Sequence, residues 1–159
     1  MLHCCRVAAS AAFAVVLAAS SAIAQDATSN PVQPPKQAGG ADVKGYPAEQ
    51  LLSTGTTIVG EPIRYPTSGP AHVTASIVTL APGARTVMHR HGVPMFAYIL
   101  EGEITVDYGK HGKRTYRQGQ SLIEAMHVAH FGENTGAQPM RLIAVYMGAK
   151  GAKDVVPVK

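Results

Sequence analysis

The sequence predicts an all-β domain, a sandwich or a barrel, with jelly-roll topology as the variety that commonly hosts a ligand or a metal in its mouth. Short apolar or alternating segments recur along the chain, and tight turns rich in glycine and proline separate them. No stretch of ten or more residues in the expected domain shows convincing helical periodicity. The one candidate for a short helical turn covers residues 48–52.

The expected strands follow one another in a rhythm of short strand, tight turn and short strand. Residues 73–80 alternate in a way that predicts a strand buried on at least one face. A turn at Pro82 and Gly83 leads from this strand into the segment that contains His89 and His91. A hairpin loop is expected at 109–113, and the further expected strands are 95–100, 104–108, 115–117, 121–125, 127–131 and 142–147.

The 159-residue chain has room for one domain of ordinary size, which we expect at residues 48–150. Residues 1–24 predict a secretory signal peptide, because a basic start, a short Ala-rich apolar run and small residues precede Gln25. An uncleaved membrane anchor is the alternative, although the apolar run is short for a spanning helix. Residues 25–47 predict a disordered Pro/Gly-rich leader and 151–159 a flexible tail. A periplasmic location follows from the signal peptide.

Composition excludes several kinds of site and partner. Cys4 and Cys5 both lie in the predicted signal peptide, so the mature chain has no disulfide and no thiolate ligand. Loss of Arg6 with that peptide leaves 13 Lys and Arg against 10 Asp and Glu, a formal charge of +3. The basic residues are scattered, apart from a group in and just after the loop at 109–113. We therefore expect no nucleic-acid partner, and no membrane contact once the signal is cleaved.

His89 and His91 stand one residue apart on an expected strand, so their imidazoles should point to the same face. Two imidazoles on one wall are a natural half of a metal site, because zinc, copper, iron and nickel all accept neutral imidazole nitrogen. Without a partner, an H-x-H pair is more often surface or core histidine than a ligand. The remaining ligands of such a site must come from elsewhere in the chain.

Two spaced motifs resemble the signature of the cupin superfamily. The first motif resembles G-x5-H-x-H-x3-E-x6-G, and its intervals are kept by Gly83, His89, His91 and Gly102. The second motif resembles G-x5-P-x-G-x2-H-x3-N, and its intervals are kept by Gly119, His130 and Asn134. The resemblance covers roughly residues 83–134. It implies a single-domain cupin double-stranded β-helix, which is a jelly-roll barrel, and it suggests a homodimer.

The resemblance also implies that His89, His91 and His130 bind one divalent transition metal, such as Fe, Cu, Ni or Zn, in the mouth of the barrel. Where the family pattern has glutamate, this chain has Met95. Met95 is either an apolar plug beside a three-histidine site or a soft fourth ligand, which would favour copper. In both cases a carboxylate charge is lost, so ions that prefer carboxylates become poor candidates and the bound ion keeps its full charge.

Two residues near the second motif are candidates for the surroundings of the metal. His127 is either a rim residue that donates or carries a proton, or a histidine that faces solvent. Glu124 could act as an acid or a base, but an exposed surface carboxylate is the default interpretation. Ala125 and His127 replace the usual proline and glycine of the second motif, which leaves the turn there less certain.

Together these features predict a periplasmic mononuclear-metal cupin, a small metalloenzyme with dioxygenase-like activity on a small organic substrate. Three neutral histidines suit iron or copper that binds a chelating substrate and oxygen. The alternatives are a non-catalytic periplasmic module that binds a small ligand or a metal, and an oxygen-independent lyase or isomerase. One fold hosts many reactions, so the fold by itself selects none of them. The sequence identifies no catalytic base or nucleophile.

Overall fold

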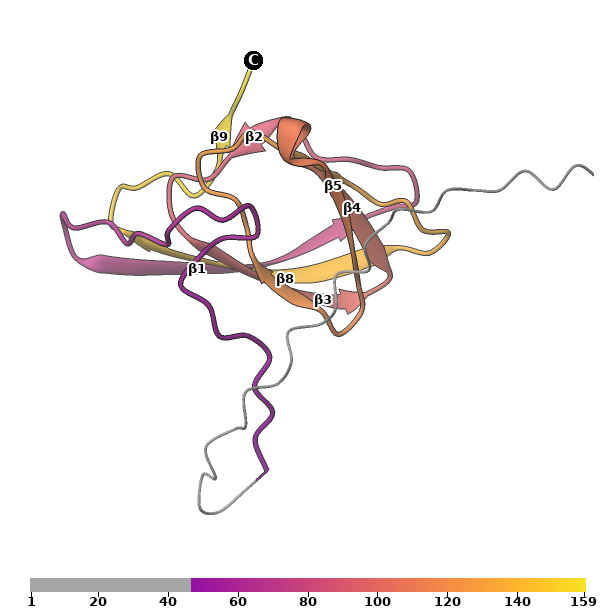
Figure 1. Cartoon of the computed structure of the whole chain (residues 1–159), viewed down its shortest axis with the longest axis horizontal. Helices are drawn as coiled ribbons and strands as arrows, with labels where there is room; N and C mark the ends of the chain where they lie inside the picture. Colours follow the sequence, from indigo (N-terminus) through magenta and orange to yellow (C-terminus); the bar gives the residue numbers. More distant parts are fainter. Residues whose placement is uncertain (1–46) are drawn as a thin grey trace, which may run out of the picture. The chain divides into compact units, whose positions relative to one another are not determined.

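The computed structural model describes residues 47–159; the predicted signal peptide and nearly all of the predicted leader lie outside the described residues. The regular structure is almost entirely β, as the sequence predicts (Figure 1). No helix in this part of the chain is long and apolar enough to cross a membrane. In chain order the elements are β1 (Ala71–Leu80), β2 (His89–Arg90), β3 (Met95–Glu101), β4 (Glu103–Asp107), the 3-10 turn η1 (Gly109–His111), β5 (Lys113–Arg117), β6 (Ser121–Ile123), β7 (Phe131–Glu133), β8 (Met140–Ala149) and β9 (Val156–Pro157).

Two antiparallel sheets form the body of the domain. The larger sheet has the strand order β1-β8-β3-β6, and the smaller has the order β5-β4-β7. Figure 1 shows β1, β8 and β3 in one layer, with β4 and β5 in the other. A third, two-stranded sheet pairs β2 with β9. Because β1 pairs along its whole length with the distant β8, the fold is closed by long-range pairing, as in a jelly roll.

The hydrophobic core lies between the inner faces of the two main sheets. On β3, Met95, Ala97 and Ile99 are buried, whereas Phe96 and Tyr98 are partly exposed on the outer face. This alternation is the period of two that a strand requires. The neighbouring strand β8 adds Leu142 and Ala144 to the core, and β4 of the opposite sheet adds Ile104 and Val106.

Three local expectations differ from the structure. No helical turn forms at 48–52. The expected strand 127–131 is mostly loop, and β7 begins only at Phe131. The predicted flexible tail contains β9, which is ordered because it pairs with β2 and because the N–H of Val158 donates to the carbonyl of Met88 at 3.0 Å. The order of the tail thus depends on a long-range pairing that local sequence does not reveal.

Asn134, the last residue of the second motif, is fully buried and joins two loops. Its Nδ2 donates to the carbonyls of Leu80 at 2.9 Å and Gln138 at 2.8 Å, and its Oδ1 accepts from the N–H of Gly136 at 3.0 Å. A buried amide whose polar atoms are all paired stabilises a fold instead of taking part in chemistry. The motif asparagine is therefore a structural residue here.

Gly102, the last residue of the first motif, provides a test of the turn between β3 and β4. Its φ is 70°, and a Cβ there would lie 2.8 Å from the carbonyl oxygen of Pro139. We expect Gly102→Ala to lower the free energy of unfolding by about 2 kcal/mol, because the left-handed backbone is strained and the clash is with main chain. Urea denaturation measures this loss. Gly55→Ala is the matched control, since a Cβ at Gly55 would meet nothing within 4 Å. Equal losses in the two variants would contradict the argument.

Candidate metal centre

The three predicted ligands come from two segments that pair with each other. His89 and His130 lie opposite one another in an antiparallel bridge, where the N–H of His89 donates to the carbonyl of His130 at 2.9 Å and the reverse bond is 2.8 Å. Residues directly opposite in such a pair point to the same face. His91 follows two residues after His89, and its N–H donates to the carbonyl of Met126 at 3.0 Å. The pairing therefore brings three imidazoles to one place.

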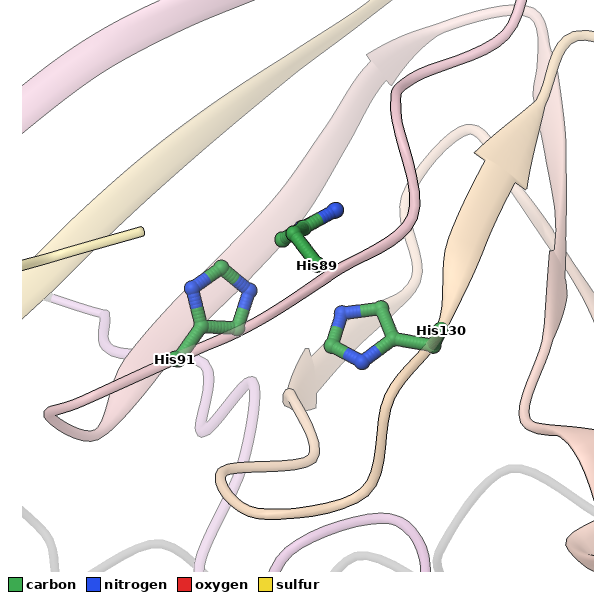
Figure 2. A group of neighbouring side chains, drawn as sticks. All are labelled: His89, His91 and His130. Carbon is green, nitrogen blue, oxygen red and sulfur yellow. The ribbon is translucent and has the colours of Figure 1, made fainter. Parts of the chain in front are cut away.

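Figure 2 shows the three rings gathered around a common space. The ring centroids of His89 and His130 are 4.6 Å apart, those of His89 and His91 4.9 Å, and those of His91 and His130 5.2 Å. One ligand atom from each ring lies within 4.8 Å of the other two. His91 and His130 are each only 2% exposed. The structure thus brings together all three residues of the predicted ligand set.

The hydrogen bonds of these histidines determine which ring nitrogen is free. Each Nδ1 lies 2.8 to 2.9 Å from a backbone carbonyl, which can only accept, so each Nδ1 carries the proton and each Nε2 keeps a lone pair. The Nε2 of His130 is buried and has no hydrogen-bond partner among the described residues. Metal-binding histidines almost always donate their other ring nitrogen in this way. The donor set therefore fits a divalent transition metal held by three Nε2 atoms. The carbonyls belong to Val87 for His89, Asp154 for His91 and Val128 for His130.

Burial keeps these imidazoles neutral. Desolvation lowers the pKa of all three histidines, and it lowers that of His91 to about 4. The proximity of His89 and His130 lowers the pKa of His91 further, because like charges repel, although the hydrogen bond to Asp154 opposes the shift. At neutral pH the three lone pairs are thus free to bind a metal, without competition from protons.

The imidazoles open into a cavity of about 80 Å³. Its walls are mostly apolar. A larger surface hollow of about 390 Å³ lies beside Glu103 and Arg117, but it shares no lining residue with the imidazoles and is not part of the site. Besides the three histidines, the small cavity is lined by Val78, Thr86, Met95, Ile104, Val106, Glu124, Gly132, Leu142 and Tyr146.

Glu124 is 5% exposed, so the interpretation as a surface carboxylate is wrong. It directly follows β6, and its Oε2 lies 4.0 Å from the Nε2 of His130. Its Oε1 accepts from the N–H of Ala125 at 2.7 Å. Burial raises the pKa of Glu124 to about 7, although hydrogen bonds from Ala125 and Tyr108 oppose the shift. A carboxyl group that titrates near neutral pH therefore shares the cavity with the three imidazoles.

The structure separates the two other candidates. Met95 is 7% exposed and lines the cavity, so the residue that replaces the family glutamate does face the site. Whether its sulfur binds a metal or only fills space stays a prediction. His127 is exposed and does not line the cavity. Only its backbone is involved, because its N–H donates to the Oε1 of Glu61 at 2.9 Å.

Glu61 is a positioning residue that the sequence does not identify. Besides its bond to His127, its carboxylate accepts from the N–H of Met126 at 2.7 Å and from the hydroxyl of Thr57 at 3.2 Å. Burial alone would raise the pKa of Glu61, but these hydrogen bonds hold it below its usual value. The ionised carboxylate thus fixes the loop between Glu124 and His130. Its position in a Gly-Glu-Pro turn gives no indication of this distant partner.

The segment after β8 is a second support that the sequence does not reveal. Its Asp154 carbonyl accepts the Nδ1 proton of His91 at 2.9 Å, across 63 residues of chain. The contact between this segment and the histidine strand is close, because a Cβ at Gly92 would lie 2.5 Å from the carbonyl oxygen of Lys153. Part of the predicted flexible tail therefore orients one of the three rings.

Comparison with protein families agrees with this architecture. Residues 76–146 match the family model described as "Cupin domain". This match supports membership of the cupin superfamily. The stretch includes both predicted motifs and all three histidines, and the predicted cupin jelly-roll fold is confirmed. No curated protein matches the chain in sequence.

Solved structures similar to this chain include two oxalate decarboxylases and a polyketide cyclase. The oxalate decarboxylase of Bacillus subtilis is 23% identical, with a TM-score of 0.45 over 54% of this chain and 24% of its own. That of Lactobacillus farciminis, a formate complex, is 20% identical, with a TM-score of 0.46 over 54% and 26%. The polyketide cyclase RemF of Streptomyces resistomycificus is 18% identical, with a TM-score of 0.48 over 62% and 68%. The chain thus spans about a quarter of the length of the oxalate decarboxylases.

Removal of the Glu61 carboxylate should loosen the loop that carries His130. We expect Glu61→Ala to lower the free energy of unfolding by about 2 kcal/mol, because two backbone N–H groups lose a charged acceptor. Zinc affinity should fall about tenfold, as is usual when a support behind a ligand is lost. Urea denaturation and competition against a chromophoric chelator measure the two effects. Glu49→Ala, at an exposed position, is the control. If Glu61→Ala has the stability and zinc affinity of this control, Glu61 does not stabilise the loop before His130.

The lowered pKa of His91 predicts a loss of stability in acid for the metal-free protein. Between about pH 6.5 and pH 4 the unfolded chain binds a proton at His91 that the folded chain does not, so stability falls as pH falls. Glu124 acts in the opposite sense, because its pKa is raised on folding. Comparison of wild type with His91→Asn separates the contribution of His91 from that of Glu124, because Glu124 is present in both proteins. From pH 7 to pH 5, wild type should lose about 2 kcal/mol more unfolding free energy than His91→Asn, measured by urea denaturation in chelator. Parallel losses in the two proteins would contradict the assignment.

Proposed function

We propose that this protein is a periplasmic mononuclear-metal enzyme with dioxygenase-like activity on a small organic substrate. The observation that carries the proposal is the set of three buried imidazoles, each with Nδ1 bonded to a backbone carbonyl and Nε2 free. The unpartnered Nε2 of His130 supports it most directly, because a buried acceptor without a partner is costly unless something binds it.

The donors narrow the choice of metal. His89, His91 and His130 supply neutral imidazole nitrogen, which suits iron, copper, nickel or zinc. Three protein ligands leave coordination positions open, as a catalytic site requires. When bound, such an ion would supply Lewis acidity and, as iron or copper, one-electron chemistry. The chain itself orients the rings through three backbone carbonyls and keeps them free of protons by burial.

The cavity limits the size and character of the substrate. About 80 Å³ beside the imidazoles admits only a few non-hydrogen atoms at a time. Side chains such as Val78, Ile104 and Leu142 give it apolar walls. A small organic molecule, or the reactive end of a larger one, fits these walls better than a strongly charged polymer. A small-molecule partner is therefore part of the proposal.

Glu124 favours an enzyme over a passive binding module. Its pKa of about 7 places a titrating carboxyl group in the same cavity as the three donors. Ionisable groups with strongly shifted pKa values gather at functional sites, because catalysis uses both protonation states. The oxygen-independent lyase or isomerase would use the same residues, so the experiment must separate it from the dioxygenase.

Elemental analysis followed by oxygen-consumption assays tests the proposal. Wild-type protein from its native compartment should contain about one transition metal per chain, and His130→Ala should lose it, because the ligand set drops from three donors to two. His72→Ala, an exposed histidine on β1, is the control and should keep the metal. Oxygen uptake should then appear in a screen of phenolic and diketone substrates.

Each contrary result has its own meaning. Metal retained by His130→Ala would refute the three-histidine centre. Bound metal without turnover would favour the binding module, and turnover without oxygen would favour the lyase or isomerase. The periplasmic location is tested separately by cell fractionation and N-terminal sequencing, which should find mature chains that begin at Gln25.

A further inference from the structure

The cavity contains a carboxylate although the position expected to provide one does not. Residue 95, where the family pattern has glutamate, is methionine. Among the residues that line the cavity, the one acidic side chain is Glu124. It lies in the second motif, and the segment that carries it pairs with the strand that carries Met95.

Backbone pairing places Glu124 beside Met95. β3 and β6 are antiparallel, with Phe96 opposite Ile123, and the N–H of Glu124 donates to the carbonyl of Met95 at 2.9 Å. The pairing thus continues by one residue beyond β6. Residues that lie directly opposite each other on two paired strands point to the same face, with their Cβ atoms only about 5 Å apart. Tyr146 lies opposite Met95 on the other side, so the inner row runs from Tyr146 through Met95 to Glu124.

The atoms at the end of this row suit a shared ion. The N–H of Ala125 donates to Oε1 of Glu124 at 2.7 Å, and the hydroxyl of Tyr108 also donates to this carboxyl group. Oε2 of Glu124 lies 4.0 Å from the Nε2 of His130. Two donors that each bind one ion at about 2.1 Å can be at most about 4.2 Å apart. At 4.0 Å the two atoms do not hydrogen-bond to each other, and both are acceptors once the carboxyl group is ionised. A cation between them would satisfy both acceptors.

We propose that Glu124 is a direct ligand of the metal and that the carboxylate of this site has moved across the β3–β6 pair from residue 95 to residue 124. The proposal rests on the proposed three-histidine centre and adds a fourth ligand to it. Met95 then forms an apolar wall, and its sulfur is not required as a ligand. A bound carboxylate also reduces the charge of the site by one and restores affinity for ions that prefer oxygen, such as manganese or iron.

Titration with Co(II) and Mn(II) alone tests this without any substrate. Glu124→Gln should weaken Co(II) binding at least about tenfold and Mn(II) binding more, because an oxygen ligand is lost while the shape is kept. The visible spectrum of the Co(II) protein should change as the ligand set changes. Met95→Leu is the matched control at the facing position and should leave both affinities within about twofold of wild type, since only the apolar wall is altered.

A relocated carboxylate makes the strongest test. In Met95→Glu/Glu124→Gln the carboxylate returns to residue 95, and Mn(II) affinity should recover most of what Glu124→Gln loses. Equal affinities and spectra for wild type and Glu124→Gln would overturn the proposal. If Glu124→Gln does not fold, a crystal structure of zinc-loaded wild type decides: an Oε atom at about 2.0–2.2 Å from zinc supports a ligand, and a distance beyond about 3 Å overturns it.

The failure of the underlying centre gives a different pattern. His130→Ala should bind Co(II) far more weakly than Glu124→Gln does. Wild-type Co(II) affinity in His130→Ala would refute the three-histidine centre and the fourth ligand together. Weak binding by His130→Ala with wild-type binding by Glu124→Gln would refute only the role of Glu124.

Discussion

Three imidazole nitrogens that direct their lone pairs into one buried space are the constraint on which the rest of the site depends. Acceptors in that position repel one another and lose their hydration, and the buried Nε2 of His130 has no hydrogen-bond partner among the residues that the structure describes. The fold tolerates this arrangement because the backbone fixes it. The mutual backbone hydrogen bonds of His89 and His130 hold the two rings side by side. His91 lies two residues after His89, so its ring points to the same place. A bound cation would relieve the repulsion that the backbone imposes.

Around these rings, the orientation of each side chain depends on a main-chain partner. The carbonyls of Val87 and Val128 are local, but that of Asp154 comes from the far end of the chain. Glu61 holds the loop before His130 from the opposite end of the domain. The site is therefore assembled by parts of the chain that lie outside both motifs. Substitutions in these parts can weaken metal binding without any contact with the metal.

Charge distinguishes this site from the family pattern that it resembles. The loss of glutamate at residue 95 would leave a divalent ion surrounded only by neutral groups. Glu124 changes this, since a buried carboxylate beside the imidazoles contributes a negative charge as soon as it ionises. The expectation that carboxylate-preferring ions are poor candidates rested on methionine at residue 95, which leaves three neutral imidazoles as the implied ligands. With the side chain buried in the cavity, the choice of metal is open toward manganese and iron as well as copper and zinc.

The sequence by itself determined the all-β class, the position of most strands and the three histidines. These features are local: alternation along residues 95–101, glycines where φ is positive and an H-x-H interval are all encoded in neighbouring residues. Only the tertiary structure decided the burial of Glu124 in the cavity, the role of Glu61 as a support for the loop before His130, and the pairing of β9 with β2. Glu61 and Met126 are 65 residues apart, and His91 and Asp154 are 63. No local period relates residues at such separations, because the pairing of distant strands brings them together.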